Sequence, residues 1–192
     1  TTVSRFLEYK LTGQSEYMLL IPCEGVRTVY TELEGKLQYD DVRRELWRDF
    51  SIRLDWPVLL EVKVPPPAGW NAGYYHSEGN LGRYQLNKMG AGQSHHVTVR
   101  PSLPTSVFRA ILAHELTHAY QTEKRILLEN QALREGMARW IENHFLRTDH
   151  PKDAAKLLNL KHFTFGKAVN TIVEYEKCNG REKTLQWLQA QA

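Results

Sequence analysis

Apolar and polar positions in the first half of the chain change over short runs, a pattern typical of strands. Residues 16–22 and 58–64 are predicted to form buried strands. A helical pattern over residues 26–50 lies between them, and the Tyr-Asp-Asp segment at 39–41 is a candidate break that would divide it into two helices. The pattern in this half therefore predicts strands with one helical stretch between them.

Further short strands are expected before the middle of the chain. Residues 74–76 and 84–86 favour strands, and Gly79 and Gly82 separate them. Residues 95–99 alternate between polar and apolar side chains, which predicts another strand. This alternation should place the neighbouring residues His95 and His96 on opposite faces of the sheet.

The pattern takes on a helical period after Pro104. Thr105 or Ser106 is the expected N-cap, and some fifteen residues without Pro or Gly follow. Apolar side chains cover more than half of the circumference of this helix, which predicts that it is mostly buried. They are Val107, Phe108, Ile111, Leu112, Leu116 and Ala119, and the narrow remaining strip holds Arg109, Ala113 and Thr117.

A second helix is predicted from residue 132 onward. Its apolar face carries Leu133, Met137, Trp140, Ile141 and Phe145, and the opposite row carries Glu135, Ala138 and Glu142. His144 lies on the apolar face and is expected to be a core histidine. Together the two halves predict an α+β fold, β-rich over about 1–100 and helical over about 101–192, within one domain.

Composition fits this picture and narrows the partners. The 192 residues are 42% apolar, enough for the core of one domain or of two tightly joined lobes, and the formal charge is only +3. Lys and Arg do not cluster with aromatic residues, so we expect no nucleic-acid partner. No apolar run approaches the roughly 20 residues that cross a bilayer, so no transmembrane segment is expected.

Compartment and oligomeric state stay open. The sequence begins Thr1-Thr2 without a methionine, so both a cytoplasmic protein and an exported one that has lost a targeting segment fit it. Cys23 and Cys178 are too few for a second metal site, and they are expected to be buried thiols or, in an exported protein, one disulfide.

The metal chemistry is indicated by His114-Glu-Leu-Thr-His118, which lies within the first predicted helix of the second half. Residues four apart on a helix differ by about 40° around the axis and roughly 6 Å along it, so both imidazoles can reach one ion. Glu115 lies about 100° further round, where its carboxylate can reach a water on that ion. Polar side chains in a buried helix need partners, and we therefore expect zinc rather than two satisfied core histidines.

A third protein ligand is needed, and Glu135 on the second helix is the first candidate. A glutamate on a polar helix face is usually only solvated. Gly136 and Ala138, however, are small residues that would let two helices approach closely enough for a carboxylate to reach the ion. The alternatives, ranked below Glu135, are Glu129, Glu142, Asp149 and His150.

Residues 111–121 and 133–142 resemble the metal helix and the glutamate helix of the gluzincin zinc metallopeptidases, the latter through a Glu-Gly-x-Ala core. The interval between His118 and Glu135 is similar to that of the minimal gluzincins and of DA1-type peptidase domains. The resemblance covers roughly residues 95–190, and the paired cysteines that precede DA1-type domains are absent from the sequence. It implies a zincin-like fold.

The same resemblance implies that His114, His118 and Glu135 hold Zn²⁺ and that Glu115 is the base in hydrolysis of a peptide or protein substrate. Asn, Asp or backbone carbonyl groups should bind the outer ring nitrogens of both histidines. A donor for the transition-state oxyanion is not fixed by any motif, and candidates are His162, Tyr175, Tyr74 and Tyr75. Tyr120 should face away from the ion.

Two further expectations concern the use of the site. In the resembling peptidases an edge strand beside the metal helix pairs with the extended substrate, and residues 95–99 are a candidate for that strand. The alternative function is a non-catalytic binding or scaffold protein that retains the fold and the metal site. A metal enclosed by four protein ligands would favour that alternative.

Overall fold

The computed structural model describes residues 7–8, 18–19, 27–63, 81–89, 92–158 and 166–191, and the fold is mixed α+β. Its strands are β1 (Leu7–Glu8), β2 (Met18–Leu19), β3 (Thr28–Val29), β4 (Val58–Val62), β5 (Gly82–Met89), β6 (Gly92–Val99) and β7 (Leu103–Pro104). Its helices are α1 (Glu32–Phe50), α2 (Thr105–Glu123), α3 (Gln131–Leu146), α4 (Pro151–Leu158), α5 (Gly166–Asn179) and α6 (Arg181–Gln189).

The main sheet has the strand order β4-β6-β5, with β4 parallel and β5 antiparallel to β6. The prediction of a strand at 95–99 is confirmed, but its assignment as an edge strand is wrong. Leu59 and Gln85 both lie opposite His96 in the register, so β6 is paired on both sides. A central strand has its backbone donors and acceptors already engaged and cannot pair with a substrate.

The other predicted strands are confirmed in part. The strand expected at 84–86 extends over the whole of β5 and includes Gly82. β4 lies at an edge of the sheet and is not fully buried, since Leu59 is 53% exposed. Within the run 16–22 only the two residues of β2 are described, and the strand expected at 74–76 lies outside the described residues.

Helix α1 is continuous, so the break expected at residues 39–41 is wrong. The helix begins at Glu32 because Thr31 and Glu34 form a capping box. Residues Val42, Leu46 and Phe50 bury one side of the helix, while Asp40 is on the solvent side, where its charge does not interrupt the helix.

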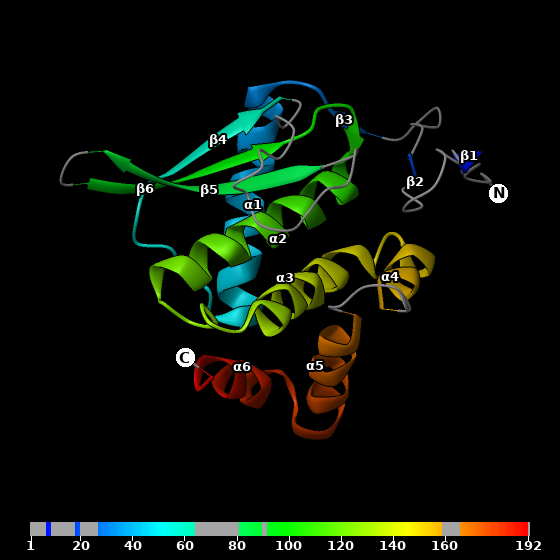
Figure 1. The fold of residues 1–192 in the computed structure, drawn as a ribbon. Coiled ribbons are helices and arrows are strands. Elements are labelled where there is room, and N and C mark those ends of the chain that lie inside the picture. The colour runs from blue at the N-terminus through cyan, green and yellow to red at the C-terminus, as the bar shows by residue number, and fades with distance from the viewer. Residues whose placement is uncertain are drawn as a thin grey trace.

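Helix α2 runs through the centre of the fold, with the main sheet on one side and α3 on the other (Figure 1). Its burial is confirmed and exceeds the prediction, because Ala113 and Thr117 of the supposed open strip are fully buried as well. The N-cap is Pro104, not Thr105 or Ser106. The backbone N–H and the hydroxyl of Thr105 donate instead to the carbonyl of Arg27, next to β3.

Helix α3 packs between α2 and α5. Its polar row does not face solvent, since Ala138 and Glu142 are buried. The expectation that Gly136 brings α3 close to α2 is wrong: a Cβ atom at Gly136 would lie 3.0 Å from the Cβ of Ala168 and 3.1 Å from Ile172, both in α5. Gly136 thus permits the close packing of α3 on α5.

One apolar core extends from Val29 to Leu188 and joins the strands to the helices. Val97, Phe108, Met137 and Ile172, taken from β6, α2, α3 and α5, are all fully buried within it. Among the described residues, none of the helices is long and apolar enough to cross a membrane. The core therefore fixes α2 against both of its neighbours, the sheet and α3.

Candidate metal centre

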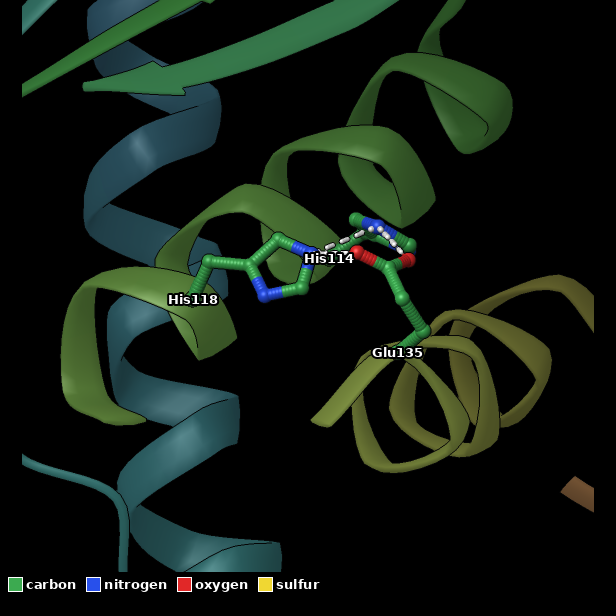
Figure 2. A group of neighbouring side chains, drawn as sticks. All are labelled: His114, His118 and Glu135. Atoms are coloured by element: carbon green, nitrogen blue, oxygen red, sulfur yellow. Dashed lines mark hydrogen bonds and ion pairs between the residues drawn. The ribbon is translucent and has the colours of Figure 1, made fainter. Parts of the chain in front are cut away.

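Three predicted ligands converge between α2 and α3 (Figure 2). The Nε2 atoms of His114 and His118 are 3.1 Å apart. Glu135 reaches toward them from α3, with Oε1 3.2 Å from Nε2 of His118 and Oε2 3.7 Å from Nε2 of His114. The three side chains thus present their donor atoms to one common point.

These separations fit a single coordinated cation. Two donors that each lie about 2.05 Å from a tetrahedral zinc ion are roughly 3.3 Å apart, close to the three distances observed among His114, His118 and Glu135. The side chains are partly to largely buried, with exposed fractions of 12%, 10% and 15%. Within the described part of the chain, this is the group of His, Cys, Asp or Glu side chains that could hold a metal ion.

Each of the two histidine rings has a hydrogen-bond acceptor at its Nδ1 atom, while its Nε2 atom faces the other candidate ligands. The Nδ1 of His114 is 2.8 Å from a carboxylate oxygen of Glu142, and the Nδ1 of His118 is 2.9 Å from Oε1 of Gln121. An acceptor at Nδ1 places the ring proton there and leaves the lone pair of Nε2 for a metal. Glu142 is therefore a partner of a ligand rather than a ligand.

The sequence-based expectation of Asn, Asp or backbone carbonyl groups at these positions is wrong in residue type. Two signals could have found the actual partners. Gln121 lies three positions after His118, so it shares a face of α2 with it. Glu142 lies two turns after Glu135 in the polar row of α3, so both side chains are on the same side of that helix. The row that indicated Glu135 as the third candidate ligand could therefore also have indicated Glu142 as the partner of His114.

Several carboxylates give the site a negative electrostatic environment. Burial disfavours the charged ring of His114, but Glu142, with Glu115 and Glu135 nearby, outweighs this and raises the pKa of His114. Burial also opposes ionisation of Glu135, yet its interactions with His118, His114 and Arg139 lower its pKa to about 2. An ionised carboxylate beside two imidazoles is a suitable donor set for a divalent cation.

Glu115 is buried beside this group rather than within it. Its exposed fraction is 8%, and burial raises the pKa of its carboxyl group, although the neighbouring His114 and His118 oppose this. Gly82, the first residue of β5, packs directly on it: a Cβ there would lie 2.8 Å from Oε1 of Glu115 and 2.6 Å from Ile111. Among the described residues β5 pairs only with β6, so it is an edge strand of the described sheet. Its first residue, Gly82, lies against Glu115 of α2.

The remaining candidate ligands are not brought into the group. Glu129 and Asp149 are exposed, and His150 is 2.6 Å from the hydroxyl of Ser106. His144 lies at the margin of the core: its ring packs edge-on against the core residue Phe50, its side chain is 18% exposed, and its Nε2 is 3.3 Å from a carboxylate oxygen of Asp49.

The candidate donors for the oxyanion remain predictions. The Tyr175 ring stacks on Trp187, with centroids 4.7 Å apart, and His162, Tyr74 and Tyr75 lie outside the described residues. The hydroxyl of Tyr120 accepts a hydrogen bond from Gln189 of α6. Cys178 is exposed, so it is not a buried thiol, and Cys23 lies outside the described residues.

A second buried polar group, which the sequence pattern did not indicate, lies near the end of α2. His95 is fully buried between the hydroxyl of Tyr84, 3.2 Å from Nδ1, and the carboxylate of Glu123, 3.2 Å from Nε2. Glu123 also accepts backbone hydrogen bonds from Asp55 and Trp56. This group connects α2 to the sheet and to the segment before β4.

No protein-family model, no curated protein and no solved structure matches this chain. The description of the site therefore rests on its side chains: three donor groups from α2 and α3, and the adjacent carboxylate of Glu115. A metal ion could be held by His114, His118 and Glu135.

Proposed function

We propose that this protein is a zinc-dependent peptidase with a gluzincin-like, zincin-type core. The observation that carries the proposal is the position of Glu115. Its carboxylate is buried next to three converging donor atoms and beside the first residue of an edge strand. A metal site that serves only structure needs no additional carboxylate beside its ligands.

Zn²⁺ is the ion that two imidazoles and one carboxylate suit best, because this donor set provides three protein ligands of a four-coordinate catalytic site. When bound, such an ion polarises a carbonyl group and lowers the pKa of a coordinated water. His114, His118 and Glu135 would hold it, while Glu142 and Gln121 would keep both rings in the required orientation.

The protein's own part in the reaction is proton transfer by Glu115. Its carboxylate accepts a proton from the water whose oxygen forms a bond to the peptide carbonyl carbon. When the C–N bond breaks, the same carboxyl group gives that proton to the departing nitrogen. Burial against Gly82 limits the positions that this carboxylate can take, which favours both transfers.

An extended peptide would bind by pairing with β5 rather than with β6. Two observations favour β5: its first residue, Gly82, lies on Glu115, and among the described residues this strand pairs only with β6. Backbone pairing with an edge strand holds a peptide extended with little dependence on its sequence. Substrates of this kind are segments of peptide or protein that can adopt a strand conformation.

Replacement of Glu115 by Gln tests the proposed function. The expected result is zinc bound with unchanged stoichiometry and loss of cleavage of a peptide library, because an amide of the same shape cannot accept the proton. A matched control is Glu174→Gln, an exposed glutamate on α5, which should cleave like the wild type. Cleavage by the Glu115→Gln protein at the wild-type rate would contradict the mechanism. A wild type that binds zinc but cleaves nothing would favour the binding or scaffold alternative.

A further inference from the structure

Gln121 uses both ends of its side chain within the protein interior. It is fully buried in the last turns of α2. Its Nε2 donates to the backbone carbonyl of Arg134 at 2.8 Å, and its Oε1 is 2.9 Å from Nδ1 of His118. One side chain thus bridges a metal-ligand candidate on α2 and the backbone of α3.

The carbonyl of Arg134 determines how the Gln121 amide is oriented. A carbonyl oxygen can only accept, so it must face the NH₂ end of the amide, and the amide oxygen is then directed at His118. An oxygen at this position requires the proton of His118 to be on Nδ1. The backbone of α3 therefore selects, through Gln121, the tautomer of His118 whose Nε2 lone pair faces the site.

Residue 134 immediately precedes the third ligand, Glu135. The same residue is held a second time, because the guanidinium of Arg134 donates to the hydroxyl of Thr122 at 3.1 Å. Two consecutive residues of α2 therefore fix the position of the first turn of α3. A displacement of residue 134 along α3 would displace the Glu135 carboxylate with it.

We infer that Gln121 is a positioning residue that couples His118 to Glu135 and sets the separation of these two ligands. This inference rests on the proposed metal site but not on peptidase activity. Glu142 makes the corresponding connection in the other direction, from α3 to His114. Through both bridges, hydrogen bonds between α2 and α3 bring the three candidate ligands together.

The test is a double-mutant cycle on metal affinity. Gln121→Met keeps the length and the apolar packing but removes both hydrogen bonds. Its affinity for Zn²⁺, measured by competition with a chromophoric chelator, should fall about 10- to 100-fold, as is usual when the partner of a ligand is lost. The same substitution in a Glu135→Ala background should cost at least about threefold less, since the coupled ligand is already absent.

A control substitution, a second variant of Gln121 and a measurement of folding accompany the cycle. Thr117→Val removes a buried hydrogen bond to Ala113 within the same helix and should leave zinc affinity within about twofold, which corresponds to less than 0.5 kcal/mol. Gln121→Asn is a second variant, too short to reach both partners, and should weaken binding like Gln121→Met. Thermal unfolding of each metal-free variant shows that the protein is folded.

An equal loss of affinity in both backgrounds would overturn the coupling, because Gln121 would then act through His118 alone. Unchanged affinity in the Gln121→Met protein would overturn the inference altogether. Failure of the proposed function gives a different result: zinc affinity would respond to Gln121 as described, but no peptide would be cleaved.

Discussion

Gly82 lies against Glu115 so closely that a methyl group on Gly82 would fall 2.8 Å from the carboxylate oxygen. Any side chain at this position must displace the carboxylate, the neighbouring Ile111 or the start of β5. The absence of a side chain therefore gives the edge strand its approach to the proposed base.

Gly82→Ala should lower kcat/KM for a peptide substrate by roughly 10- to 100-fold, because an acid or base shifted by a fraction of an ångström loses its alignment. Zinc affinity should stay within about twofold of the wild type, since the atoms nearest to a Cβ at Gly82 belong to Ile111 and Glu115 and not to the three ligands. Gly35→Ala is the control: its Cβ would lie 2.5 Å from Val62, away from the site. It should reduce stability without a selective loss of kcat/KM. Equal effects of both substitutions on kcat/KM would argue against a special role for Gly82.

Glu142→Gln should weaken zinc binding by about tenfold. The amide oxygen can still accept from Nδ1 of His114, but it lacks the negative charge that makes this ring a stronger donor to the metal. Glu142→Ala should lose more, because it also leaves the ring without its buried partner. Isothermal titration of metal-free protein with Zn²⁺ measures both. An affinity in Glu142→Ala equal to that of the wild type would show that the contact does not support the site.

Glu123 should make the stability of the protein dependent on acid. Burial opposes its ionisation, but hydrogen bonds from Lys124, from the backbone of Trp56 and Asp55 and from His95 outweigh this and lower its pKa from 4.5 to about 2. A carboxyl group whose pKa is lower in the folded than in the unfolded state stabilises the folded protein at pH values above the unfolded-state pKa. This contribution, about 3 kcal/mol at neutral pH, is lost as the pH falls from about 5 toward 2.

Urea unfolding of the metal-free wild type and of Glu123→Gln across this pH range measures the effect. The two free energies of unfolding should differ most at pH 6 to 7 and converge as the pH falls toward about 2, where the carboxyl group becomes protonated in the folded protein as well. A constant difference between the two proteins at every pH would contradict the role assigned to this carboxylate.

The parts of the site that lie on one helix could be predicted from the sequence. His114, Glu115 and His118 are related by the helical repeat alone, and Glu135 follows from a polar row on a second amphipathic helix. The remaining contacts of the site could not be predicted, because they join residues that are far apart in the sequence. The contact of Gly82 with Glu115 joins residues 33 positions apart and depends on how β5 crosses α2, which no local pattern encodes.

Several errors share one physical origin, the choice of tertiary partner. The strand at 95–99 was expected at the edge of a sheet, but alternation shows that a strand has two faces and not how many strands pair with it. Gly136 was expected to face α2, but a small residue permits close packing without specifying the neighbour, which is α5. Asp40 and Asp41 suggested a break because no local pattern shows that Asp40 lies on the solvent side of α1 or that Asp41 faces Arg109 of α2.

The zinc content of the dialysed protein, measured by elemental analysis alongside that of Glu135→Ala, tests the central claim most directly. We expect about one zinc ion per wild-type chain, because two imidazoles and a carboxylate form a complete set of protein ligands. We expect the ion to be lost or largely depleted in Glu135→Ala, with Glu129→Ala, an exposed residue, unchanged. A wild type that retains no metal after zinc is supplied, or a Glu135→Ala protein with full occupancy, would contradict the assignment.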